Sequence, residues 1–270
     1  MTDILKNLLI EEKEFHSSWE GRHRTSTMLD PKKRNSMHQN YPIWRQAVVH
    51  WCYSIIDHVD TDRELVYIAM TIVDRYLGSN TKLTKVAYER SVIASLLISI
   101  KLYAEDYICP GQILQMVSNK FSSREIMNTT IEIYESLSLE TPIPTPARFV
   151  RTLVQLLPNH SFGPGEKSRI FDNARGQIEL AVQDSFCSNI PASLVAWMAI
   201  ENALEIESFD PDDLHQFRSH VFNATGLELN TGLRYRIETL RPISDVFSVI
   251  LESMYSNHTP ILRRIPKRKE

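Results

Sequence analysis

Three charged residues, Arg45, Asp74 and Lys101, stand within apolar helical patterns. An unpaired charge in an apolar helix face costs several kcal/mol or more, whereas two helices packed side by side let Arg45 and Asp74 neutralise each other. We therefore predict that they form a buried ion pair of the scaffold, with a place on a partner-binding surface as the alternative. Lys101 comes near the end of the most apolar helical segment, so we expect its ammonium group at the surface beside hydrophobic neighbours.

A second group of residues is apolar: Trp44, Ala47, Val48 and Trp51 follow an i, i+3, i+4, i+7 spacing. Most stripes of this kind pack into a core. Two tryptophans near the start of one helix are equally compatible with a partly exposed apolar groove, and such grooves usually mark partner sites. Both interpretations stay open at this point.

The other polar residues do not form a catalytic or metal-binding motif. His215 and His220, for example, lie five positions apart, which does not match the i, i+4 pair of a helical zinc site. The sequence also lacks a glycine-rich phosphate loop, a nucleophile elbow and a Cys-X-X-Cys pair. We therefore expect no enzymatic activity, no metal and no cofactor.

The composition favours a soluble, helical, intracellular protein. Of 270 residues, 43% are hydrophobic and 23% are charged, and the presence of only 8 glycines disfavours a loop-rich β fold. The net charge of −3 gives no general attraction to nucleic acid or to anionic membranes. The three cysteines are scattered, no signal-peptide pattern is present, and the longest apolar run, 92–100, is too short to span a bilayer.

Helical periodicity predicts an all-α fold. Residues 3–16 are expected to form a short amphipathic helix, and the polar, basic stretch that follows is interpreted as an arm. Five helices are then expected at about 42–58, 63–77, 85–104, 111–119 and 123–137. The third of these is apolar on all sides, which is usual for a buried central helix.

Three prolines at alternate positions, Pro142, Pro144 and Pro146, forbid a continuous helix and mark a domain boundary. Beyond them, helices are expected at about 146–157, 164–183, 191–204, 210–223 and 228–253. The predicted division is an N-terminal helix and arm (1–40), a first domain (41–140), a linker (141–147), a second domain (148–256) and a basic tail (257–270). The tail is interpreted either as a solvated end or as a nuclear import signal.

These motifs, taken in order, resemble those of the cyclin family. Residues 44–48 are similar to the family's Met-Arg-Ala-Ile-Leu motif, and Trp51 falls at its tryptophan. Residues 74–77 resemble Asp-Arg-Phe-Leu, and 94–101 resemble the segment that ends in Ser-Lys. Phe149 after Thr145-Pro146 is similar to the entry of a second box. The resemblance covers about residues 41–260 and implies two tandem five-helix cyclin boxes with a short N-terminal helix.

The resemblance implies a regulatory subunit that binds and activates a cyclin-dependent protein kinase in cell-cycle control, in the nucleus and/or cytoplasm. Lys101, Leu102 and Tyr103 would contact the kinase's mobile helix. The groove of Trp44, Ala47, Val48 and Trp51 would recruit kinase substrates with basic-hydrophobic motifs. No nucleic acid and no membrane is expected as a partner.

One position departs from the family pattern. Cyclins usually place a glutamate on the fifth helix of the first box to help hold the kinase, and that position is Thr130 here. Glu132 and Glu135 are near in sequence but point to other helix faces. Two alternatives therefore remain: a cyclin-fold scaffold without conventional kinase activation, and a transcription-associated cyclin or transcription factor, which the acidic balance disfavours. The short N-terminal helix and arm fit a G1-type, D-type-like cyclin better than a mitotic one.

Overall fold

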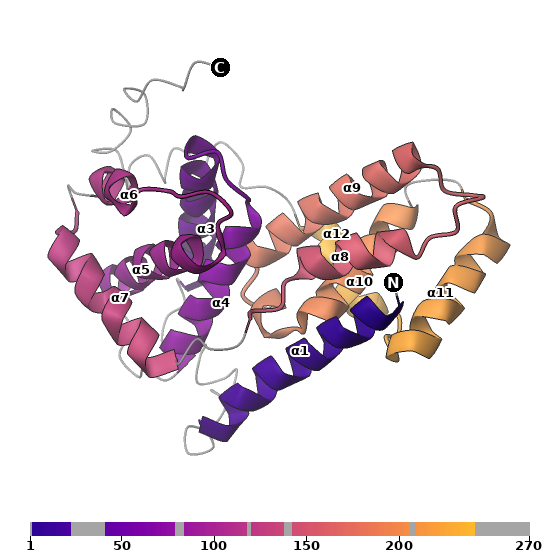
Figure 1. The fold of residues 1–270 in the computed structure, drawn as a ribbon, viewed down its shortest axis with the longest axis horizontal. Helices are drawn as coiled ribbons and strands as arrows, with labels where there is room; N and C mark the ends of the chain where they lie inside the picture. Colours follow the sequence, from indigo (N-terminus) through magenta and orange to yellow (C-terminus); the bar gives the residue numbers. More distant parts are fainter. Residues whose placement is uncertain are drawn as a thin grey trace. The chain divides into compact units, whose positions relative to one another are not determined.

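The computed structural model describes residues 2–22, 41–78, 84–117, 120–137, 142–205 and 209–240. All regular structure within these ranges is helical and none of it is strand, so the predicted all-α fold is confirmed. The helices in these ranges fall into two compact units (Figure 1). None of the helices in the described ranges combines the length and the apolar character needed to cross a membrane.

The first unit contains five of the described helices: α3 (Tyr41–His58), α4 (Glu64–Gly78), α5 (Lys85–Tyr103), α6 (Pro110–Val117) and α7 (Ser123–Leu137). The central helix is α5, which packs against α3, α4 and α7 and is buried continuously from Ser91 to Ile100. Its small side chains, such as the fully buried Ser99, let neighbouring helices approach closely. The Ser99 hydroxyl donates to the Leu96 carbonyl at 2.9 Å, so the buried hydroxyl is satisfied within the helix.

Local hydrogen bonds explain where two of these helices begin. The Thr84 side chain accepts a hydrogen bond from the Ala87 amide at 3.1 Å and so caps α5. Before α7, the Ser122 amide and hydroxyl donate to the Glu125 carboxylate at 2.9 and 2.7 Å, while the Ser122 hydroxyl oxygen accepts from the Glu125 amide. This is a capping box, and it fixes the start of α7.

The second unit combines the N-terminal helix α1 (Thr2–Arg22) with α8 (Pro146–Gln155), α9 (Pro164–Gln183), the 3-10 helix η1 (Cys187–Asn189), α10 (Ala192–Glu205), α11 (Pro211–Thr225) and α12 (Thr231–Thr239). Its central helix is α10, which is buried along most of its length against α8, α9 and α12. The chain enters this unit at Thr145, whose side chain accepts from the Arg148 amide at 3.3 Å to cap α8.

Two helix ends differ from the sequence expectation. The first is α1, which continues to Arg22 instead of ending near residue 16, because the segment contains no proline that would stop it. The second is α12, which ends at Thr239 because the backbone of Leu240 is extended. The rest of the helix predicted up to residue 253 lies outside the described residues. The predicted arm from residue 23 and the basic tail lie outside the described residues.

Candidate partner-binding surfaces

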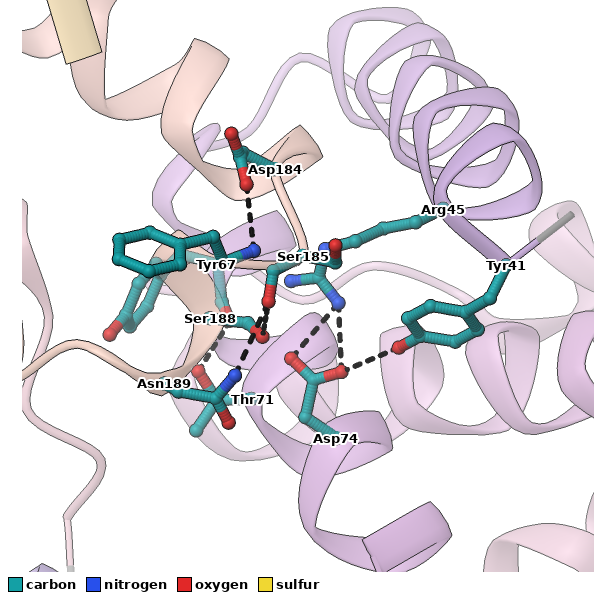
Figure 2. Close-up of polar contacts among 10 residues, drawn as sticks. Tyr41, Arg45, Tyr67, Thr71, Asp74, Asp184, Ser185, Ser188 and Asn189 are labelled. Atoms are coloured by element: carbon teal, nitrogen blue, oxygen red, sulfur yellow. Dashed lines mark hydrogen bonds and ion pairs between the residues drawn. The ribbon is translucent and has the colours of Figure 1, made fainter. Parts of the chain in front are cut away.

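An ion pair joins α3 to α4 in the first unit (Figure 2). The Arg45 Nη1 atom lies 2.8 and 3.0 Å from the two carboxylate oxygens of Asp74, and the Tyr41 hydroxyl donates to the same carboxylate at 3.1 Å. The Arg45 side chain is 2% exposed and that of Asp74 is 13% exposed. Burial alone would lower the pKa of Arg45, but the Asp74 charge and hydrogen bond outweigh burial and raise it, so the guanidinium stays charged.

Tyr88 of α5 completes this cluster. Its ring centroid lies 5.4 Å from that of Tyr41 and 6.5 Å from that of Trp44. Complete burial raises the pKa of Tyr88 well above its ordinary value, so the phenol stays neutral. Because Arg45, Asp74 and Tyr88 come from three successive helices, the cluster fixes how α3 and α4 pack beside α5. Arg45 and Asp74 thus lie in the scaffold, and the exposed positions of the unit are elsewhere.

The last turn of α5 emerges at the surface. Lys101 and Leu102 are exposed, Leu102 to 45%, and Tyr103 is half-buried. The helix ends at Tyr103, and the cap residue Ala104 has an extended backbone and an amide that donates to the Ile100 carbonyl at 3.1 Å. A lysine in the last turn also interacts favourably with the helix dipole. The structure therefore exposes Lys101 and the apolar Leu102 as neighbouring residues, at the end of a helix that is buried from Ser91 to Ile100.

A second exposed feature, which we name the α7 stripe, consists of Met127, Ile131 and Tyr134. These side chains are 45, 51 and 53% exposed, and their i, i+4, i+7 spacing places them on one face of α7. The buried face of the same helix, about a third of a turn away, carries Ile126 and Ile133. Sequence reasoning missed the stripe, although a helix with a second apolar face carries the signal.

Thr130 lies next to the α7 stripe and is half-buried. Its hydroxyl donates to the Ile126 carbonyl at 2.8 Å, one turn back along the helix, so its hydrogen is already used. The exposed carboxylate of Glu132 accepts from the Tyr76 hydroxyl at 3.4 Å, and Glu135 is also exposed. The acidic groups of α7 therefore lie on other faces than Thr130, as the sequence spacing indicates.

A mainly apolar pocket, which we name the α3 pocket, lies among α3, α5 and α6. Of the four residues predicted to form a groove on α3, the structure brings two to this pocket and leaves two outside its lining. Ala47 is buried in the core at 3% exposure, and Trp44 is half-buried beside Tyr88. The apolar lining comes from these three helices and from the segment after α6, and it consists of Val48, Trp51, Val92, Ile93, Met116, Val117 and Phe121.

An ion pair supplies the polar groups in the lining of the α3 pocket. The Glu89 carboxylate, whose side chain is 5% exposed, lies 2.6 Å from the Lys120 ammonium nitrogen and 3.9 Å from that of Lys85. A few placed polar groups in an apolar pocket orient whatever binds there. Sequence reasoning did not single out Glu89, although an acid between Tyr88 and Val92 carries the same signal as Arg45 does on α3.

The described residues also include histidines, acids and cysteines that lie outside these surfaces. Among them, no group of three His, Cys, Asp or Glu side chains is arranged to hold a metal ion. Cys52 and Cys187 are buried, as their apolar sequence context indicates, whereas Cys109 is exposed. Burial raises the pKa of the Cys52 thiol, which keeps it protonated and unreactive.

Comparison with known proteins shows what this chain is similar to. Residues 13–141 match the family model of the cyclin N-terminal domain. The structure of a viral cyclin from herpesvirus saimiri shares 16% sequence identity with a TM-score of 0.62, over 93% of this chain and 99% of the viral one. A chain in the structure of the CAK complex from Chaetomium thermophilum bound to ATP-gamma-S shares 13% identity with a TM-score of 0.54, over 96% of this chain and 80% of that one. A search of curated protein sequences gives no significant match.

Proposed function

This chain belongs to the cyclin family, and from that premise we propose that it is a regulatory subunit that binds and activates a cyclin-dependent protein kinase in cell-cycle control. The observation that carries the proposal is the exposed end of α5, where Lys101 and Leu102 emerge from a buried helix. The α7 stripe adds exposed apolar side chains on a helix that packs against α5. Similarity to a chain of the CAK complex supports a kinase as the partner.

Activation by this chain is conformational. A mobile helix of the kinase packs on Leu102 and the α7 stripe, and an acidic group of that helix pairs with Lys101. These contacts favour the active arrangement of the kinase, so binding shifts its population towards that state. The cluster around Arg45 and Asp74 keeps α5 in place, and little binding energy is then spent on ordering the surface.

The α3 pocket serves substrate recruitment in the same proposal. Its apolar walls accept an aliphatic or aromatic side chain of a substrate segment, and Val48 and Trp51 supply the part of the predicted groove that remains accessible. A basic residue of the substrate motif pairs with the Glu89 carboxylate by displacing the Lys120 ammonium group, which lies 2.6 Å from it in the free chain. Recruitment at this pocket raises the local concentration of a substrate near the kinase.

One observation favours a second candidate, a scaffold of cyclin fold without conventional kinase activation. The Thr130 hydroxyl is bonded to its own helix backbone, and no carboxylate of α7 takes its place. A kinase helix that requires a carboxylate at the position of Thr130 therefore has no such group to bind. The two candidates differ in one measurable property, since only the first predicts stimulation of kinase activity.

Binding and activity assays with purified cyclin-dependent kinases test the proposal. We expect the wild-type chain to bind at least one of them and to raise its activity, and Lys101→Glu to weaken binding by about tenfold or more through charge reversal. Lys6→Glu makes the same charge change at an exposed position of α1 and serves as the control. Binding without stimulation would favour the scaffold, and undiminished binding by Lys101→Glu would exclude the proposed kinase face.

A further inference from the structure

The buried face of α1 contains a carboxylate. Leu5, Leu8, Glu12 and Phe15 follow an i, i+3, i+7, i+10 spacing, and their exposed fractions are 0, 4, 6 and 4%. This face packs within the second unit, where α1 contacts α8, α10 and α11 (Figure 1). A charge in the middle of an apolar stripe is costly unless a partner is placed to meet it.

The partner of Glu12 is the first turn of α10. The Ser193 amide donates to one carboxylate oxygen at 2.9 Å, and the Ser193 hydroxyl donates to the other at 2.5 Å. The first amides of a helix have no acceptor within that helix, and the helix dipole favours negative charge there. Glu12 therefore supplies, from a different helix, the acceptor that the start of α10 lacks.

Two further polar contacts join α1 to the rest of the second unit. The Arg148 guanidinium of α8 lies 3.0 Å from the Glu11 carboxylate, and a ring nitrogen of His220 on α11 lies 3.3 Å from the Thr2 hydroxyl. Each of the three helices that α1 contacts thus contributes one polar residue to the contact. A buried polar group at a single position of an apolar stripe fixes the register of a helix, because any shift leaves that group unpaired.

The connectivity of α1 differs from that of the helices it contacts. Its neighbour in sequence among the described helices, α3, belongs to the other unit, so packing contacts hold α1 in the second unit. A helix held in this way opens as one body when its contacts break, and its opening leaves α8, α10 and α11 connected to one another.

We propose that α8, α10 and α11 form a docking surface for an acidic amphipathic helix, that α1 of the same chain is its occupant, and that the Glu12 carboxylate controls whether α1 is docked. This proposal is independent of the kinase-binding function. The surface selects its occupant by two features together, an apolar stripe and one acid at the position that meets the start of α10. An amphipathic helix without that acid leaves the Ser193 amide unpaired.

The test uses the full chain with a specific protease site inserted between residues 22 and 41, so that α1 is cut free after folding. In the cut protein we expect α1 to co-elute with the body of the chain on gel filtration and to dissociate on dilution. Glu12→Gln is expected to raise the dissociation rate roughly 10- to 100-fold, because a hydrogen-bonded charge is lost. Glu14→Gln, the same change at an exposed position of α1, leaves the rate unchanged.

Hydrogen exchange on the uncut chain gives a second readout. We expect amides of α1 to exchange at least about tenfold faster than those of α10, and Glu12→Gln to accelerate exchange in α1 while leaving α3–α7 unaffected. If Glu12→Gln does not fold, Ser193→Ala, which removes one of the two hydrogen bonds, provides the same comparison with Glu14→Gln. Equal rates in the two compared variants, or equal exchange in α1 and α10, would overturn the proposal. Dimerisation of the uncut chain through exchanged α1 helices would assign the surface to a second copy and overturn it as well.

Discussion

At the scale of single residues, charges placed inside apolar helix faces organise both units. Arg45 meets Asp74 in the first unit. In the second, the completely buried Glu201 carboxylate accepts hydrogen bonds from the Arg218 guanidinium at 3.0 and 2.7 Å. Each pair joins two helices, so each contributes to the position of one helix relative to another. Such pairs need not add net stability over a well-packed apolar core, but breaking one leaves a buried charge without its partner.

Asp74→Ala is therefore expected to lower the free energy of unfolding by about 3–5 kcal/mol, because it removes the carboxylate that pairs with the buried Arg45 charge. Urea denaturation measures the loss as a shift in midpoint at constant slope. The matched control is Asp57→Ala, which breaks an exposed pair with Arg63 at 3.6 Å, and we expect it to cost about 1 kcal/mol or less. Similar losses in the two variants would show that the Arg45–Asp74 pair does not hold α3 and α4 together.

A second residue-scale prediction concerns acid stability. Hydrogen bonds from the Ser161 hydroxyl and from His160 lower the pKa of Asp213 below its ordinary value of 3.8. A depressed pKa in the folded state means that the stabilisation is complete above the pKa of the unfolded state. It is lost as the pH falls through 3.8 towards the lower folded-state pKa. We expect the melting temperature of Asp213→Asn to fall less than that of the wild type over this window, and parallel curves would contradict the assignment.

At the scale of helices, the sequence predicts the existence and order of the elements well, because apolar periodicity and caps are local signals. The start of α5 at Thr84 and the start of α8 at Thr145 follow directly from capping residues. The helix ends that differed from the prediction, such as the end of α1, are ends without such a signal in the sequence. The neighbours of α1 in space could not be predicted at all, since helical periodicity shows that a face is buried but does not show against which helix.

The α7 stripe belongs to the same scale. Ile131→Glu places a charge in the middle of the stripe, at a site that is 51% exposed, so the fold should tolerate it. If the kinase packs on this face, the affinity of the chain for the kinase should fall by about tenfold or more, because the charge must be desolvated on binding. Calorimetric titration measures the affinity, and the thermal melt checks the fold.

The control for this prediction is Val86→Glu. Val86 is 55% exposed in the first turn of α5, at the opposite end of that helix from Lys101, so it matches Ile131 in exposure and in the chemistry of the change. Val86→Glu should leave both the melting temperature and the kinase affinity unchanged. An equal loss of affinity in the two variants would remove the α7 stripe from the proposed interface.

At the scale of the whole molecule, two helical units each enclose a buried central helix, α5 in one and α10 in the other. The candidate site uses the first unit, and the sequence predicts part of it. The exposure of Lys101 could be predicted from its position near the end of an apolar helix, whereas Leu102 was indicated only by the resemblance to cyclins. The rest of the site depends on which helix faces remain uncovered after packing, and periodicity alone does not supply that information. This applies to the exposed side chains of Met127, Ile131 and Tyr134 and to the carboxylate of Glu89 in the α3 pocket.

The most direct test of kinase binding at the end of α5 and along α7 is hydrogen exchange of the full chain with and without a bound cyclin-dependent kinase. We expect kinase binding to slow exchange in peptides that cover residues 100–104 and 126–135, while α9 and α12 in the second unit stay unchanged. A stable complex in which those two segments exchange as in the free chain would contradict the proposed interface.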